Sequence, residues 1–272
     1  MAPDVLMKKP DWGKRIRRAI ELAELHPSCA EVLVFYQHIL DFQKALSDDI
    51  SLRPAPTLNT ETSFRKQLDI DVAAQRLPAL LSLVQKKGPS KLAQEAATIG
   101  GCAPEQQREM LRSFMQAADN DSGDVSFFYA RVLFQPHAEH LAATQATRLV
   151  GFGGSVCPVC GARPQVAVLR PEGVGGKHFL VCSFCLTEWE FRRILCPICE
   201  EEHNAQLPRY SADEFLAVRV EACDTCKYYL KSVDMTVDGL AVPMVDEVAT
   251  VPLDVWAVEH GYKKIEPNIM GF

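Results

Sequence analysis

The sequence has no apolar run near the roughly 18 to 20 residues that a membrane-spanning helix requires. Its N-terminus, residues 1–12, is polar and contains no hydrophobic core of the kind found in secretory signal peptides. Basic residues are not in excess, because 29 lysines and arginines stand against 35 aspartates and glutamates. We therefore expect a cytoplasmic protein that is not inserted in a membrane and has no nucleic-acid partner.

Common catalytic signatures are missing as well. The sequence has no glycine-rich phosphate-binding loop, no nucleophile elbow and no paired carboxylates in a familiar catalytic context. Its 272 residues are 47% apolar and 24% charged, which is typical of a globular protein with enough length for two domains. Nothing in these features points to a substrate pocket.

Cysteine is rare in the first 150 residues, where Cys29 and Cys102 stand alone and are expected to be small buried hydrophobic side chains. Apolar residues at helical spacing predict two helices around 12–20 and 32–46, with Ser28 as a cap of the second. Further helices are predicted at 71–87, at 90–99, after Pro104, and at 124–149, where Pro136 either bends one helix or starts another. A loop is expected at 53–63. Residues 1–150 are therefore predicted to form an α-helical domain.

The glycines at 151–155 mark a boundary, after which the pattern changes to short β-like runs. These runs are 165–169, 178–181, 189–195, 215–220 and 228–233. A final helix is predicted at 251–260, with Thr250 as its cap, Pro252 in its first turn and Gly261 after its end. Residues 151–272 are predicted to form a second domain.

Most cysteines lie in this second half. Eight of the ten form four Cys-x-x-Cys pairs, namely Cys157 and Cys160, Cys182 and Cys185, Cys196 and Cys199, and Cys223 and Cys226. In a reducing compartment such pairs indicate metal ligands rather than disulfides. The third and fourth pairs repeat the first and second at an offset of 39 to 41 residues. A tandem repeat of one site, in which consecutive pairs share a metal ion, is the simplest interpretation.

Each pair has the chemistry of a metal-binding turn. Two intervening residues let the chain direct both sulfurs at one point, and backbone N–H groups within the turn can donate to them. Two such turns form a closed tetrahedral site of four sulfurs, which suits zinc or a single iron ion. Two alternatives stay open. The first and third pairs could share a metal through interleaved ribbons, or four thiolates could hold iron–sulfur clusters.

The residues next to the cysteines refine this prediction. Pro-Val in the first pair and Pro-Ile in the third resemble the insertions of rubredoxin, so we expect two iron ions per chain, with zinc as the alternative. Gly161 follows the first pair, where the turn often needs a positive φ angle. Glu200 takes this place after the third pair, which leaves the geometry of that turn open.

Histidine is not needed to complete either site. We expect His178 to be a strand residue. His137 and His140 are expected to have surface or capping roles, because no carboxylate or cysteine near them completes a metal site.

The cysteine pairs stand among further recognisable residues. The segments 157–161, 178–199 and 223–231 contain the pairs together with Glu188-Trp189, Arg192 and Tyr229-Leu230-Lys231, and the segments 256–262 and 268–272 end the chain. In these segments the chain resembles the FdhE family of formate dehydrogenase accessory proteins. We predict an α+β fold in which the helical domain is followed by tandem rubredoxin-like or zinc-ribbon-like metal-binding modules.

The resemblance implies a cytoplasmic accessory or chaperone protein that is not an enzyme. It implies binding to the catalytic subunit of a respiratory, molybdenum-containing formate dehydrogenase during maturation. It also implies oxygen-sensitive, rubredoxin-like iron sites with the eight cysteines as ligands.

Two other functions stay open. One cysteine pair could transfer sulfur or electrons during cofactor insertion, although no pair starts a helix that would lower a thiol pKa. Zinc ribbons also serve as scaffolds or bind nucleic acids. However, residues 151–272 hold 11 basic and 17 acidic residues, a balance that repels phosphate groups.

Overall fold

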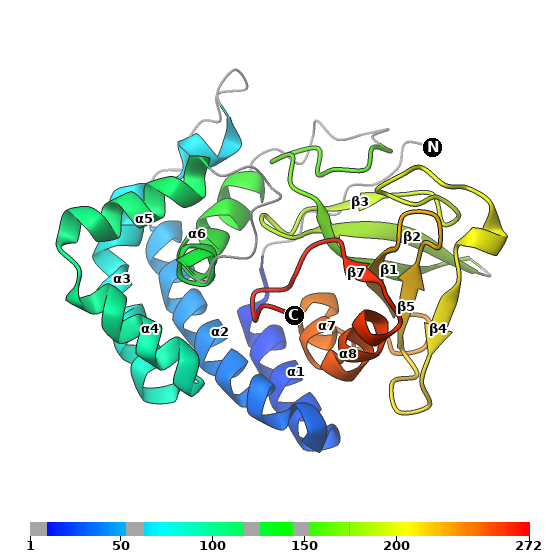
Figure 1. Cartoon of the computed structure of the whole chain (residues 1–272), viewed down its shortest axis with the longest axis horizontal. Coiled ribbons are helices and arrows are strands. Elements are labelled where there is room, and N and C mark those ends of the chain that lie inside the picture. The colour runs from blue at the N-terminus through cyan, green and yellow to red at the C-terminus, as the bar shows by residue number, and fades with distance from the viewer. Residues whose placement is uncertain (1–9, 53–62, 117–125, 144–152, 174) are drawn as a thin grey trace.

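The computed structural model describes residues 10–52, 63–116, 126–143, 153–173 and 175–272. In these residues a helical part is followed by one mixed β-sheet with two short helices beside it (Figure 1). The helices of the first part are α1 (Trp12–Leu25), α2 (Ala30–Ser51), α3 (Ile70–Lys87), α4 (Ser90–Gly101), α5 (Pro104–Gln116) and α6 (Ser126–Ala143). This arrangement confirms the predicted α+β fold class.

Side-chain caps start two of the helices. Asp11 accepts a hydrogen bond of 2.8 Å from the Lys14 N–H at the start of α1, and Asp69 caps α3 in the same way. The predicted cap of α2 is wrong, because Ser28 lies in a short 3₁₀ turn, Pro27–Cys29, that ends where the α-helix begins. Cys29 takes the N-cap position, and its side chain accepts no cap hydrogen bond.

Proline and glycine interrupt the helices less than their propensities predict. α6 continues through Pro136, so the region forms one helix in the described residues. α4 continues through Gly100 and Gly101, at a cost of about 1 kcal/mol per glycine relative to alanine. In the described ranges, no helix has the length and apolar character needed to cross a membrane.

Seven strands form the sheet of the second half. They are β1 (Pro164–Glu172), β2 (Gly175–Cys182), β3 (Glu188–Glu190), β4 (Arg209–Ser211), β5 (Val218–Ala222), β6 (Tyr228–Asp234) and β7 (Lys263–Lys264). The order is β3-β2-β1-β6-β5-β4, with β7 paired to β6. Five of these strands overlap the predicted runs, whereas β4 and β7 have only three and two residues and were not predicted.

Six of the seven strands form two copies of one unit. β1, β2 and β3 pair antiparallel in sequence order, and β4, β5 and β6 do the same. In both units one cysteine pair precedes the first strand and another stands between the second and third strands. The units join through the parallel pairing of β1 with β6. The predicted tandem repeat is thus present, as halves of one continuous sheet.

Two helices follow the sheet, α7 (Pro243–Val248) and α8 (Val251–Glu259). α8 agrees with the predicted C-terminal helix, whereas α7 was not predicted. Thr250 takes the predicted N-cap position of α8, but its side chain accepts no cap hydrogen bond. Its hydroxyl instead donates to the carbonyls of Asp246 and Glu247 at the end of α7.

One apolar core joins the helices to the sheet. Leu33 and Ile39 of α2, Leu141 of α6, and Leu180 and Trp189 of the sheet belong to it and are all 0% exposed. The predicted boundary after residue 150 lies outside the described residues, as does the predicted loop at 53–63 except for its last residue. The division into domains 1–150 and 151–272 therefore stays a prediction.

A group of buried charges lies between β6, α7, α8 and β7. Lys231 is 0% exposed, and its Nζ lies 3.2 Å from Glu247 Oε1 and 2.5 Å from Asp254 Oδ2. Lys264 contacts both carboxylates as well, with Nζ 2.8 Å from Asp254 Oδ1. Two cations therefore face two anions, which balances the charge in a region shielded from water.

The surroundings of this group affect its pKa values. Burial opposes the ionisation of Glu247, but Lys231 and Lys264 outweigh it and lower the pKa of Glu247 to about 2. Burial lowers the pKa of Lys231, against the attraction of the two carboxylates. Asn268 Nδ2 also donates to Glu247 Oε2 at 2.8 Å, so the carboxylate is both paired and hydrogen-bonded.

We expect Glu247→Gln to lower the free energy of unfolding by about 3 kcal/mol near neutral pH, because removal of one partner from a buried ion pair costs roughly 3–5 kcal/mol. The folded-state pKa of Glu247 is depressed, so its stabilisation is full above about pH 4.5 and is lost as the pH falls toward about 2. Urea unfolding followed by tryptophan fluorescence, at neutral pH and at about pH 3, measures both effects.

Glu202→Gln is the matched control, since Glu202 is exposed and pairs with exposed Arg192 at 2.8 Å. The free energy of unfolding of this variant should equal that of the unaltered protein. If Glu247→Gln and Glu202→Gln lowered the free energy of unfolding equally, the buried charges would add no stability.

Candidate metal centres

The structure brings the eight predicted cysteines into two groups. The first cluster is Cys157, Cys160, Cys182 and Cys185, and the second cluster is Cys196, Cys199, Cys223 and Cys226. In each cluster the four Sγ atoms lie within 4.8 Å of one another. Consecutive pairs share a cluster, as predicted, and the alternative that joined the first pair to the third is wrong.

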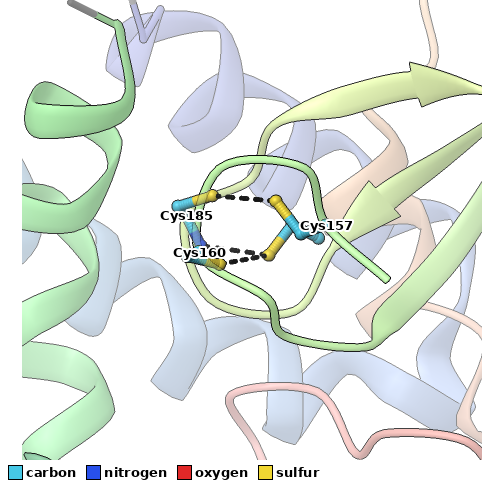
Figure 2. Close-up of side chains that lie close together, drawn as sticks. Cys157, Cys160 and Cys185 are labelled. Carbon is cyan, nitrogen blue, oxygen red and sulfur yellow. Dashed lines mark hydrogen bonds between the residues drawn. The ribbon is translucent and has the colours of Figure 1, made fainter. Parts of the chain in front are cut away.

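The sulfur positions fit tetrahedral coordination. In the first cluster, two contacts between Sγ atoms of different pairs measure 3.5 and 3.3 Å. Figure 2 labels Cys157, Cys160 and Cys185, whose side chains point toward one another. The two corresponding contacts in the second cluster both measure 3.6 Å. Four sulfurs bound at about 2.3 Å to one ion would lie about 3.8 Å apart. Each cluster could therefore hold one metal ion, either iron or zinc.

All four pairs form closely similar turns. In the first pair, the Cys157 N–H donates to the Ala162 carbonyl at 2.8 Å, and the Gly161 N–H donates to the Cys157 carbonyl at 2.9 Å. The third pair repeats both bonds with Glu201 and Glu200 as partners of Cys196. The second and fourth pairs begin with the same donation, from Cys182 to Thr187 and from Cys223 to Tyr228, both at 2.9 Å.

Each turn places the residue after its second cysteine in the left-handed region. The φ angles are 79° at Gly161, 54° at Leu186, 61° at Glu200 and 60° at Lys227. Among the described residues, the last three are the non-glycine residues with positive φ. The left-handed conformation costs such residues roughly 1–2 kcal/mol. Glu200 therefore forms the same turn as Gly161. Its backbone is strained there, whereas glycine adopts a positive φ angle without steric cost.

Backbone N–H groups donate to sulfur atoms, as predicted. The N–H groups of Phe184 and Cys185 lie 3.3 and 3.4 Å from Cys182 Sγ, and the Ile198 N–H lies 3.4 Å from Cys196 Sγ. Such bonds spread the negative charge of a thiolate, so the turns are prepared for ionised sulfurs.

The first cluster lies at the junction of the helices and the sheet. Cys157, Cys182 and Cys185 are at most 3% exposed. Phe184, between the two cysteines of the second pair, packs edge-on against Phe114 of α5 with ring centroids 5.6 Å apart. A residue inside the turn is thus part of the core that holds the helices.

Arg131 of α6 ties the same junction together. Its guanidinium donates to the carbonyl of Ser183, also inside the second pair, and to the carbonyl of Pro267, both at 2.9 Å. The side chain connects one helix, one metal-binding turn and the C-terminal segment. Loss of order at the first cluster would therefore remove contacts that hold α6 in place.

The second cluster lies nearer the surface. Cys199 is exposed and Cys226 is half-buried. A side-chain bond joins the two turns, because the Thr225 hydroxyl donates to Glu201 Oε2 at 2.7 Å. The bonds from the His203 backbone and from Thr225 lower the pKa of Glu201, so this link contains an ionised acceptor.

The crowding of thiols shifts their pKa values in opposite directions. Burial opposes ionisation of Cys157, but hydrogen bonds from the other three thiols of the first cluster lower its pKa well below the ordinary value. Burial and neighbouring thiols raise the pKa of Cys160 and Cys182 well above it. Four buried thiolates therefore need a cation among them.

The histidines stand apart from both clusters. His178 is a buried residue of β2, as predicted, and its ring nitrogens lie 3.3 Å from the Phe191 carbonyl and 3.3 Å from Glu221. His137 Nδ1 accepts a bond from the Asp69 N–H at the start of α3. Cys29 is buried as expected, while Cys102 is half-buried and donates to the Thr98 carbonyl.

Several residues that shape the clusters could not be identified from their residue types. Leu186 and Lys227 follow their cysteines as Gly161 does, so the repeat itself is the signal that places them in left-handed turns. Arg131 and Phe184 have no such signal, since their contacts depend on how the helices meet the sheet.

Comparisons with known proteins agree with this division of the cysteines. A family model described as "FdhE, central domain" matches residues 156–193, which contain the first cluster. A second, described as "FdhE, C-terminal domain", matches residues 194–270, which contain the second cluster.

Relatives match over nearly the whole chain. A protein FdhE homolog of Aquifex aeolicus is 27% identical over 98% of both chains. Protein FdhE of Escherichia coli K12 is 27% identical over 94% of this chain and 86% of its own. The crystal structure of the FdhE protein from Pseudomonas aeruginosa has the same fold, with a TM-score of 0.70 at 23% identity over 98% of both chains.

The fold and the clusters define a class, a helical protein joined to a sheet with two four-cysteine sites. Within that class, the chain is similar to proteins of the FdhE family, and residues 156–270 match the central and C-terminal domain models of that family.

We expect anaerobically purified protein to release its metal to a chelator in two phases. The second cluster should lose its ion first, because Cys199 is exposed, and the buried first cluster should lose its ion more slowly. Release can be followed with a colorimetric metal indicator. Cys199→Ser should remove the fast phase alone. A fast phase that persists in this variant would contradict the assignment.

Glycine at a left-handed position of these turns should increase the stability of the fold. Glu200→Gly should raise the free energy of unfolding by about 1 kcal/mol relative to Glu200→Ala, which removes the same carboxylate without freeing the backbone. Gly161→Ala should lower it by about 1 kcal/mol, since an added Cβ meets open space there and only the positive φ opposes it. Denaturant unfolding of metal-loaded protein measures these differences. Equal stability of the two Glu200 variants would contradict the strained turn.

Proposed function

We propose that this protein acts in the cytoplasm as an accessory or chaperone protein for a respiratory, molybdenum-containing formate dehydrogenase and binds its catalytic subunit during maturation. The similarity to proteins of the FdhE family supports the accessory class. The observation that carries the proposal is that each FdhE family match contains one complete four-cysteine cluster. All eight cysteines are proposed as metal ligands.

The metal ions would act by ordering the fold. Each cluster draws together two turns that are more than 20 residues apart in the chain. A metal ion would hold these turns and, through Phe184 and Arg131, the helices around the first cluster. The surface that meets the client would therefore depend on metal.

A tetrahedral site of four thiolates leaves no coordination position for a substrate or water. The closed donor set supports a structural role for the ions and a protein that is not an enzyme. Four sulfur ligands suit iron, which the rubredoxin-like insertions favour, and zinc is the alternative.

The exposure of Cys199 favours a second candidate, transfer of sulfur or electrons during cofactor insertion. This alternative predicts that Cys199→Ser leaves client binding intact but prevents activation of the client. The accessory-binding proposal predicts that the loss of activation follows the loss of client binding.

The direct test is anaerobic affinity purification from the native host, grown to induce formate dehydrogenase, with co-purifying proteins identified by mass spectrometry. We expect the catalytic subunit of a formate dehydrogenase to be enriched. The double variant Cys157→Ser with Cys160→Ser should lose it, because the first cluster orders the junction of helices and sheet.

Cys102→Ser is the matched control, since Cys102 is a half-buried cysteine outside both clusters, and it should retain the client. Circular dichroism of each variant separates loss of binding from loss of fold. Absence of the catalytic subunit from the unaltered protein would contradict the proposed function.

A further inference from the structure

A groove lies where the end of α1 meets the sheet part. It has a volume of about 370 Å³ and is formed by α1, the loop between β4 and β5, the loop between β6 and α7, and α7 itself. We call it the acidic groove and define it by Glu21, Leu25, Asp213, Glu214, Leu216, Val237, Asp238 and Leu240 around Arg18. None of these residues belongs to the metal clusters.

The rim of the acidic groove is apolar and exposed. Leu25, Leu216, Val237 and Leu240 are 60%, 73%, 57% and 69% exposed. They account for four of the twelve large apolar side chains that are exposed among the described residues. Single exposed apolar residues are ordinary, but a group around one groove is typical of an interaction site.

The charge of the acidic groove is mainly negative. Five carboxylates line it, from Glu21, Asp213, Glu214, Asp238 and Asp246, against the single cation of Arg18. Arg18 is already neutralised, because its guanidinium lies 2.5 Å from Asp246, 2.5 Å from Asp238 and 3.1 Å from Glu21. Among the residues that the structure describes, Glu214 forms an ion pair only with His26, at 3.9 Å. The groove therefore has an uncompensated negative potential.

The walls of the groove are formed before any partner binds. The rings of His26 and Phe215 lie 4.9 Å apart and join the end of α1 to the loop between β4 and β5. The Leu240 N–H donates to Asp238 Oδ1 at 2.9 Å, which shapes the other loop. A prepared groove loses little conformational entropy when a partner binds.

We propose that the acidic groove docks a peptide segment of the client that carries arginine or lysine next to leucine-like side chains. The cations would meet Asp213 and Glu214, and the apolar side chains would cover the exposed rim. Nucleic acid and anionic lipid are disfavoured, because the carboxylates repel phosphate. The identity of the partner as the client rests on the proposed function, whereas the chemistry of the segment rests on the groove alone.

The test uses a fluorescein-labelled synthetic peptide of arginine, leucine and serine residues, with the full-length, metal-loaded protein, in fluorescence anisotropy. We expect saturable binding that Asp213→Lys with Glu214→Lys weakens at least tenfold and that added salt also weakens. Leu216→Ser with Leu240→Ser should weaken it several-fold. A peptide with glutamate in place of arginine should not bind.

The controls change equivalent residues elsewhere. Asp41→Lys with Asp48→Lys alters the net charge by the same amount on exposed positions of α2, and Leu52→Ser with Val258→Ser alters exposed apolar residues outside the groove. Both should bind the peptide as the unaltered protein does. Equal weakening by the α2 charge control, or no binding by the unaltered protein, would overturn the docking site.

Two further readouts separate this inference from the proposed function. If the unaltered protein and the Asp213/Glu214 variant retain the catalytic subunit equally on purification, the groove does not hold the client and the proposed function still stands. If the unaltered protein captures no catalytic subunit but the groove binds peptide, the proposed function falls and the docking site stands. A dimer in light scattering that the groove substitutions abolish would identify a second copy as occupant and overturn the inference.

Discussion

Four cysteine sulfurs in a buried cluster repel one another once they ionise, and the rest of this structure depends on how that repulsion is balanced. In the first cluster burial and neighbouring thiols hold two pKa values well above the ordinary value, so the protein alone cannot keep four thiolates. A metal ion would balance the charge and join turns from distant parts of the chain. The strain at Leu186, Glu200 and Lys227 is tolerated because these turns direct the sulfurs inward.

The clusters affect the molecule at two levels. Within the sheet, each holds together one antiparallel unit of three strands, and the units meet where β1 pairs with β6. Beyond the sheet, Phe184 and Arg131 connect the first cluster to α5, α6 and the C-terminal segment. The acidic groove lies across the same two parts of the chain, since α1 forms one wall and the sheet loops form the others. Metal could therefore influence docking without touching the partner.

Features set by local sequence were predictable. The cysteine pairs, their tandem spacing and the helical periodicity all depend on residues close in the chain, and the structure contains the two clusters, the six N-terminal helices and α8. Features set by tertiary contacts were not. The three residues of β4 carry no periodicity, Ser28 was displaced as a cap by a 3₁₀ turn, and the pairing of Lys231 with Glu247 joins β6 to a helix that the sequence did not reveal. The acidic groove brings together four segments, α1, the two loops and α7, whose separate compositions are ordinary.

The most direct test of the central claim is X-ray absorption spectroscopy at the metal edge of anaerobically purified protein, combined with metal analysis. The account predicts two ions per chain, each with four sulfur ligands at about 2.3 Å and no neighbouring metal. One ion per chain, nitrogen or oxygen ligands, or a second metal atom in the nearest shells, as in an iron–sulfur cluster, would contradict it.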